Sequence, residues 1–126
     1  MRLSPRLNEI AKMVPSCDCV VDVGTDHAQL PLALLQQGVV RRAIGVDKSE
    51  MPLAQARVNR MNAGCRDSLE LRCADGLDGL ILSNRDVVVM AGMGAQTMKQ
   101  VLQATDWRGT LVLQPNRDVP RLRRWL

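Results

Sequence analysis

The sequence predicts an α/β fold, in which helices cover both faces of an open and mostly parallel sheet. Stretches of strand length alternate with stretches of helical periodicity along the chain, which is typical of parallel strands joined by right-handed crossovers. Val20, Val21 and Val23 form an apolar run that fits a central strand buried on both faces. A length of 126 residues with 46% hydrophobic content indicates one domain, over residues 1–126.

The expected elements follow one another without linkers or repeats. Helices are predicted over residues 4–13, 28–37, 50–63, 77–83 and 95–104, and strands over residues 18–23, 43–46, 68–73, 86–91 and 110–113. Ser4 is a suitable N-cap for the first helix, and Gly38 a typical stop for the second. Pro31 fits only the first turn of that second helix. Ser49 and Gly64 are the expected N-cap and stop of the third.

The strands after the first are short, mainly apolar runs, and each is followed by an acid, a glycine or a proline. An acid follows the second strand at Asp47, and an acid and a glycine follow the third at 75–76. Glycines follow the fourth strand at 92 and 94, and Pro115 closes the fifth. The basic segment 121–126 is expected to start a further helix.

Composition and charge limit the class of protein. A formal net charge of +4 and a pI of about 9.2 are compatible with a nucleic-acid partner without requiring one. With two Trp and no Tyr or Phe, the chain encodes no stacking platform for single-stranded RNA beyond Trp107 and Trp125. We find no run long enough to cross a membrane and no signal-peptide pattern, and expect a cytoplasmic protein.

The cysteines do not indicate a metal centre. The chain has four, at Cys17, Cys19, Cys65 and Cys73, and the first two form a C-x-C pair where zinc sites use C-x-x-C. In a cytoplasmic protein they are expected to be reduced and partly buried. The sequence therefore predicts no metal.

The turn after the first strand has unusual charges for a ligand-binding loop. A dinucleotide-binding turn presents several glycines to a pyrophosphate, whereas here a single Gly24 lies between Asp22 and Asp26. Two carboxylates would repel a pyrophosphate, but they suit a cationic ligand with hydroxyls and an amine, such as S-adenosylmethionine. The alternative is a strand–turn–helix with acidic caps and no ligand.

Further acids follow the neighbouring strands. Parallel strands bring their carboxyl ends to one edge of the sheet, where ligands bind. Asp47, about 20 residues beyond the glycine turn, is placed to accept hydrogen bonds from two ribose hydroxyls. Asp75 could accept one from an adenine amino group, and Asp22 or Asp26 could face the amine and sulfonium. Each acid alone could be a cap or a solvated loop residue, but acids at three successive strand ends favour an S-adenosylmethionine-dependent methyltransferase.

Several short motifs in this order give the chain a family resemblance. They are Leu-Ser-Pro-Arg-Leu at 3–7, Val-Asp-Val-Gly-Thr-Asp-His-Ala at 21–28, Asp-Gly-Leu at 75–77, Ala-Gly-Met-Gly at 91–94, Leu-Gln-Pro-Asn at 113–116 and Leu-Arg-Arg-Trp-Leu at 122–126. Over essentially its whole length the chain resembles the bacterial tRNA (adenine-N1)-methyltransferases that act on adenine 22. The resemblance implies a Rossmann-like class I methyltransferase sheet of strand order 3-2-1-4-5.

The resemblance also implies a site and a substrate. The expected partner is tRNA, the cofactor S-adenosylmethionine, and the product a methyl group on adenine N1. The residues expected to bind cofactor are Asp22, Gly24, Asp47, Asp75, Gly76, Ala91 and Gly92. Those expected to touch substrate are Met93, Gly94, Gln114, Asn116, Arg123 and Arg124.

The expected catalytic residues are Asp26 and His27. Adenine N1 carries a free lone pair, so no base has to deprotonate it. Methylation makes the ring cationic, and a carboxylate near the exocyclic amine would orient the base and stabilise that charge. Asp26 is the candidate for this role, whereas His27 either orients Asp26 or only closes the turn. A base-paired adenine would have to be opened before reaction.

The sequence departs from the family in its length, and this leaves other interpretations of its function open. Its members continue into two more strands and a helical domain, so the sequence is expected to lack both and to methylate weakly. The alternatives are a methyltransferase acting on a small molecule or protein, and a non-catalytic remnant that binds cofactor or RNA. Arg41, Arg42, Arg121, Arg123 and Arg124 are candidates for phosphate contacts. The sequence leaves the oligomeric state open.

Overall fold

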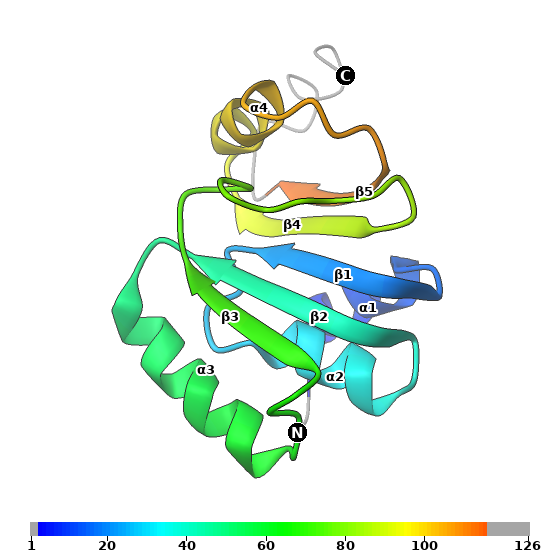
Figure 1. The fold of residues 1–126 in the computed structure, drawn as a ribbon, viewed down its shortest axis with the longest axis vertical. Coiled ribbons are helices and arrows are strands. Elements are labelled where there is room, and N and C mark those ends of the chain that lie inside the picture. The colour runs from blue at the N-terminus through cyan, green and yellow to red at the C-terminus, as the bar shows by residue number, and fades with distance from the viewer. Residues whose placement is uncertain (1–2, 116–126) are drawn as a thin grey trace.

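The computed structural model describes residues 3–115 and confirms the α/β architecture (Figure 1). Its elements are α1 (Pro5–Met13), β1 (Cys17–Val23), α2 (Gln29–Gln36), β2 (Val40–Asp47), α3 (Glu50–Asn62), β3 (Leu69–Cys73), β4 (Val87–Met93), α4 (Ala95–Gln103) and β5 (Thr110–Pro115). The helix expected over 121–126 lies outside the described residues. Within them, no helix has both the length and the apolar character needed to cross a membrane.

The five strands form one parallel sheet in the order β3-β2-β1-β4-β5, which confirms the expected strand order. β1 lies at the centre of the sheet. Its last residue, Val23, is in register with Val46 of β2 on one side and with Met90 of β4 on the other. The loops that leave β1, β2 and β4 therefore emerge side by side at the carboxyl edge.

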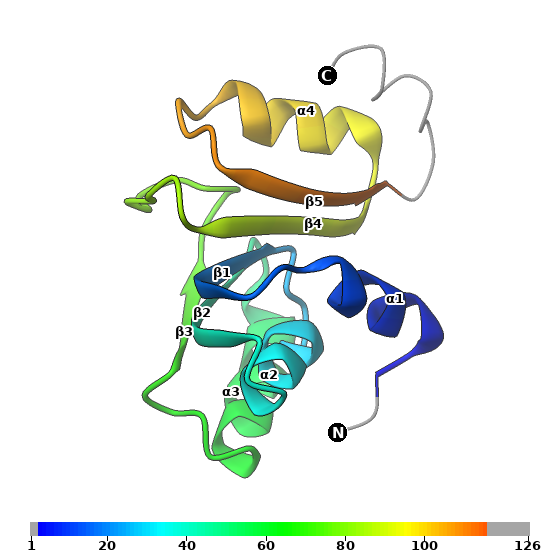
Figure 2. The ribbon, with the colours of Figure 1, turned by 90° about the vertical axis from the view of Figure 1, so that its right-hand side faces the viewer.

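Alternate residues of the sheet belong to two separate cores. Val20 and Val89 pack with Ile10, Leu32 and Leu53, which lie on α1, α2 and α3. The neighbouring residues of β1 and β4 point to the opposite face and pack with α4. Figure 2 shows α1, α2 and α3 grouped beside β1, β2 and β3, and α4 beside β4 and β5.

The short helix expected over 77–83 is wrong. That stretch is a turn followed by irregular chain. Gly76 and Gly79 both have a left-handed backbone, with φ of 61° and 76°, which interrupts a right-handed helix. The Gly79 carbonyl accepts a hydrogen bond from Arg72 Nη1 at 3.1 Å, so the side chain of a neighbouring strand fixes the loop.

The two expected serine caps behave differently. Ser4 Oγ accepts a hydrogen bond from the Leu7 backbone N–H at 3.2 Å, as an N-cap should. Ser49 occupies the N-cap position of α3 but makes no side-chain cap bond. Its backbone N–H donates to Asp47 Oδ1 at 3.0 Å, so the acid at the end of β2 determines the turn there.

Candidate active site at the carboxyl edge of the sheet

Three adjoining cavities lie along the carboxyl edge. The central one measures about 280 Å³ and is bounded by Gly24, Asp47 and Met93 among others. A cavity of about 140 Å³ adjoins it and shares Lys48 and Thr97 in its wall. A third, of about 70 Å³, shares Gly24 with the central cavity. The glycine turn after β1 therefore lies between two cavities of one continuous site.

The turn after β1 is tightly wound. The backbone N–H groups of Gly24 and Thr25 both donate to the Val46 carbonyl, at 2.8 and 2.9 Å. Gly24 has a φ of 76°, and a Cβ there would lie 2.9 Å from Met93 Cε. Asp26 and Ala28 also have left-handed φ values, 57° and 63°, which are uncommon for residues with side chains. Such backbone conformations occur preferentially where a loop positions functional groups.

Asp47 joins the loops that leave β1 and β2. Its Oδ2 accepts a hydrogen bond from the Asp26 N–H, and its Oδ1 accepts one from the Ser49 N–H, both at 3.0 Å. A carboxylate oxygen can accept more than one hydrogen bond. The carboxylate is therefore fixed in place by the backbone and still has acceptor capacity toward the central cavity that it lines.

Asp22 is a buried acid, only 5% exposed, near the end of β1. Burial raises its pKa from 3.8 to about 7, and the negative charge of Asp47 adds to that increase. The Thr25 hydroxyl lies near enough to oppose the rise. The same hydroxyl, Thr25 Oγ1, is buried and has no hydrogen bond of normal geometry among the described residues. An acid with a pKa near 7 is partly neutral at physiological pH, and it lines the about 70 Å³ cavity.

Asp26 and His27 lie together at the mouth of that cavity. His27 Nε2 is 3.7 Å from Asp26 Oδ1, and both side chains are exposed. The His27 backbone carbonyl accepts a hydrogen bond from Asn59 Nδ2 of α3 at 2.9 Å, which connects the turn to a helix. The carboxylate expected to be catalytic is therefore accessible, and His27 lies beside it.

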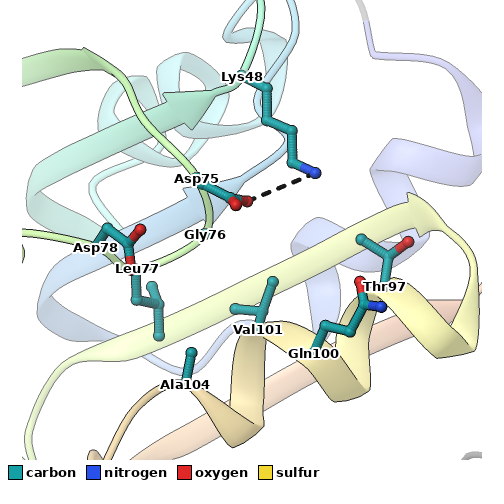
Figure 3. Close-up of a pocket in the computed structure, with 9 residues that line it drawn as sticks. All are labelled: Lys48, Asp75, Gly76, Leu77, Asp78, Thr97, Gln100, Val101 and Ala104. Carbon is teal, nitrogen blue, oxygen red and sulfur yellow. Dashed lines mark ion pairs between the residues drawn. The ribbon is translucent and has the colours of Figure 1, made fainter.

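Asp75 and Gly76 line the about 140 Å³ cavity beyond β3 (Figure 3). Asp75 Oδ1 is 3.5 Å from Lys48 Nζ, an exposed ion pair of the kind that contributes little stability. Figure 3 also shows Val101 of α4 facing this loop. A Cβ on Gly76 would approach Val101 to 3.2 Å, so the glycine allows α4 close access.

The end of β4 brings the Ala-Gly-Met-Gly segment to the site. Ala91 lines the about 70 Å³ cavity and Met93 the central one. The register with β5 shifts between Ala91 and Met93, around Gly92, whose φ is 73°. Gly94 occupies the N-cap position of α4.

Three residues at the site were not identified from the sequence. Arg6 of α1 lines the about 70 Å³ cavity and donates through Nη1 to Gln114 Oε1 at 3.2 Å. Lys48 and Thr97 both line the other two cavities. Arg6 does fall within the motif at 3–7, but only the folded chain shows that it reaches the ends of β4 and β5.

Some of the expected contacts lie elsewhere. Arg41 and Arg42 are at the amino end of β2, opposite the site, and both pair with Asp18 at 3.4 Å.

Burial, together with the nearby Asp86, raises the pKa of the Cys19 thiol to about 11. Among the described residues no group of three or more potential ligands could hold a metal ion. The remaining expected contacts, Asn116, Arg121, Arg123 and Arg124, lie outside those residues.

Several known proteins are similar to this chain in sequence and in fold. A curated relative, the tRNA (adenine(22)-N(1))-methyltransferase of Bacillus subtilis (strain 168), is 29% identical over 130 residues, which is 100% of this chain and 55% of the relative. TrmK from M. capricolum, solved with S-adenosyl-homocysteine, is 31% identical with a TM-score of 0.89, over 99% of this chain and 57% of that one.

Another relative carries the methyl donor itself. Streptococcus pneumoniae Sp1610, solved with S-adenosyl-L-methionine, is 32% identical with a TM-score of 0.91, over 99% of this chain and 61% of that one. The chain thus spans less than two thirds of the length of these relatives. A family model described as a methyltransferase domain matches residues 3–126. By this match over nearly its full length, the chain belongs to the methyltransferase domain family.

Proposed function

We propose that this chain binds S-adenosylmethionine at the carboxyl edge of its sheet and transfers the methyl group to N1 of an adenine in tRNA. The observation that carries the proposal is the row of acids around the glycine turn. Asp22, Asp47 and Asp75 lie at or near the carboxyl ends of three neighbouring strands, and each lines one of three adjoining cavities. Such a row suits a ligand that has hydroxyls, amino groups and a positive charge.

The residues that line the cavities fit this cofactor in their chemistry. The central cavity has apolar walls from Val23, Val46 and Met93, and Asp47 is at its rim. Asp47 accepts the ribose hydroxyls with the acceptor capacity left by its two backbone bonds. Asp75 accepts a hydrogen bond from the adenine amino group. To do so, its carboxylate either keeps Lys48 as a second partner or gives up this exposed ion pair.

The methionine end of the cofactor lies toward the glycine turn. Gly24 lets the ligand approach the backbone, because the residue itself carries no side chain. Ala91 of β4 lines the same cavity as Gly24, and Gly92 follows it in the chain. Asp22 is buried directly beneath, where its negative charge favours the amine and sulfonium.

The chemistry of the transfer needs little from the protein beyond placement and electrostatics. When bound, S-adenosylmethionine supplies an electrophilic methyl group, and the C–S bond breaks with its electron pair kept by sulfur as adenine N1 forms the new bond. Asp26 accepts a hydrogen bond from the exocyclic amine and stabilises the positive charge that develops on the ring. His27 orients Asp26, to which it lies at 3.7 Å. Met93, Gly94 and Gln114 contact the base.

The relatives supply the choice of tRNA. They include proteins named as tRNA m1A22 methyltransferases, among them TrmK of B. subtilis, 29% identical with a TM-score of 0.90, over 99% of this chain and 55% of that one. A net charge of +4 is consistent with a polyanionic substrate. We propose that the chain acts in the cytoplasm, because its proposed substrate is a tRNA.

The test is the identity of the methylated product. The chain is incubated with S-adenosylmethionine labelled in the methyl group and an unmodified tRNA transcript, and the tRNA is digested to nucleosides. We expect labelled 1-methyladenosine, and none from a matched transcript with adenine 22 replaced by guanine. Label in N6-methyladenosine, in another nucleoside, or only in a protein or small molecule would overturn the proposal.

A further inference from the structure

Arg6 connects the first helix to the substrate side of the site. Its Nη1 donates to Gln114 Oε1 at 3.2 Å across a sequence separation of 108 residues. A Cβ on Gly92 would lie 3.0 Å from Arg6 Nη1, so the guanidinium rests against the end of β4. It also lines the same cavity as Asp26 and His27. Arg6 of α1 is thus the point at which residues of β4, of β5 and of the turn that carries Asp26 and His27 come together.

The guanidinium of Arg6 is directed at an amide and not at an acid. Within residues 3–115 no carboxylate lies at ion-pair distance from it. Arg42 and Arg57, by contrast, pair with Asp18 and Glu50 at 3.4 and 2.9 Å. The interaction that the fold gives Arg6 is therefore the hydrogen bond to Gln114.

That bond determines which way the Gln114 amide faces. A guanidinium has only donors, so the atom of Gln114 that meets it has to be the oxygen. The Nε2 group of Gln114, which has two N–H donors, then points away from Arg6. Without Arg6, either end of the amide could take that position, because the two ends are nearly equal in size. Arg6 thereby selects one of the two possible orientations of the Gln114 amide, the one in which Nε2 is available as a donor.

Adenine has a ring nitrogen for such a donor. N1 uses its lone pair to receive the methyl group and cannot also accept a hydrogen bond. The other ring nitrogens remain acceptors, and the exocyclic amine is a donor. Asp26 takes that amine in the proposed reaction, so a second contact that recognises the base has to come from a donor.

We propose that Arg6 is a positioning residue, which holds the Gln114 amide so that its Nε2 donates to a ring nitrogen of the target adenine other than N1. The inference rests on the proposed function and deepens it. Asp26 as acceptor and Gln114 as donor match adenine. They reject guanine, which has a carbonyl oxygen in place of the exocyclic amine facing Asp26.

The test is a double-mutant cycle on single-turnover methyl transfer to tRNA. Arg6→Ala and Gln114→Ala should each slow transfer about tenfold, the effect of one lost hydrogen bond. The double variant should be no slower than either single variant, because both changes remove the same contact. Arg6→Lys should recover part of the rate, since a lysine also donates. Lys12→Ala is the matched control on α1, where Lys12 pairs with exposed Glu9, and it should leave the rate unchanged.

A further variant separates a positioning role from a structural one. Gln114→Glu keeps an oxygen for Arg6 and strengthens the pairing, but it removes the Nε2 donor. It should therefore be as slow as Gln114→Ala, with unchanged tRNA affinity and unchanged salt dependence of that affinity. A wild-type rate for Gln114→Glu would overturn the inference.

Two other results would also count against it. Independent effects, with the double variant about a hundredfold slower, would mean that Arg6 does not act through Gln114. Weaker tRNA binding with a flatter salt dependence in Arg6→Ala, at an unchanged transfer rate, would make Arg6 a phosphate contact. These results leave the proposed function standing. Wild-type chain that binds cofactor but makes no 1-methyladenosine would overturn the proposed function, and this inference with it.

Discussion

The buried acid Asp22 predicts a characteristic pH dependence of stability. Burial raises its pKa from 3.8 to about 7 in the folded chain. Between these values the folded state holds a proton that the unfolded state has released. The contribution of Asp22 to the free energy of unfolding is therefore greatest below about pH 4, falls as the pH rises toward 7, and is constant above.

The size of the effect follows from the two pKa values. Each pKa unit corresponds to 1.36 kcal/mol, so the difference between 3.8 and about 7 amounts to about 4 kcal/mol. A domain of this size has a total stability on the order of 5–15 kcal/mol. Replacing Asp22 by Asn keeps the shape of the side chain and removes the titration.

The assay is urea unfolding of the wild type and Asp22→Asn from pH 4 to pH 8. The free energy of the wild type minus that of the variant should fall by about 4 kcal/mol over this range, because other titrating groups cancel in the difference. Asp26→Asn is the matched control, since Asp26 is exposed in the same turn and Asn tolerates its left-handed backbone. A difference between wild type and Asp22→Asn that does not vary with pH would refute the reasoning.

Three further predictions concern the same turn. Gly24→Ala should weaken S-adenosylmethionine binding at least tenfold in a calorimetric titration, because the added Cβ and the displaced Met93 side chain would occupy the cavity that both residues line. Gly64→Ala has the same left-handed strain with open space around it, and should cost about 1–2 kcal/mol of stability but no affinity. Affinity for S-adenosylmethionine should rise as the pH passes through about 7, where Asp22 ionises, and this dependence should be absent in Asp22→Asn. Asp26→Asn should slow single-turnover methyl transfer about 10²-fold with unchanged cofactor affinity; an unchanged rate would remove Asp26 from the reaction.

The sheet and the position of the site could be predicted because they depend on local patterns. Val20, Val21 and Val23 identify the central strand, and parallel topology then brings the residues after each strand to one edge. The acids at 47 and 75 consequently line adjoining cavities, as their positions in the chain indicate. No contact between distant side chains is needed for this conclusion.

The features that could not be predicted depend on such distant contacts. The sequence over 77–83 does not reveal that Arg72 donates to the Gly79 carbonyl and fixes that loop. Arg6 meets Gln114 only because α1 lies beside the ends of β4 and β5. The sequence places Asp22 beside the glycine turn, but its burial follows from how α1 and α2 cover that face of β1.

The most direct test of the central claim is a calorimetric titration of S-adenosylmethionine into wild type, Asp47→Ala and Asp18→Ala. Asp18 is the matched control, because it is an exposed acid at the opposite end of β1 that pairs with arginines. We predict that wild type and Asp18→Ala bind alike. Asp47→Ala should bind about a hundredfold more weakly, because it loses its hydrogen bonds to the ribose together with the two backbone hydrogen bonds that hold the turn. Folded wild-type chain that does not bind, or an Asp47→Ala variant that binds as tightly, would contradict the account.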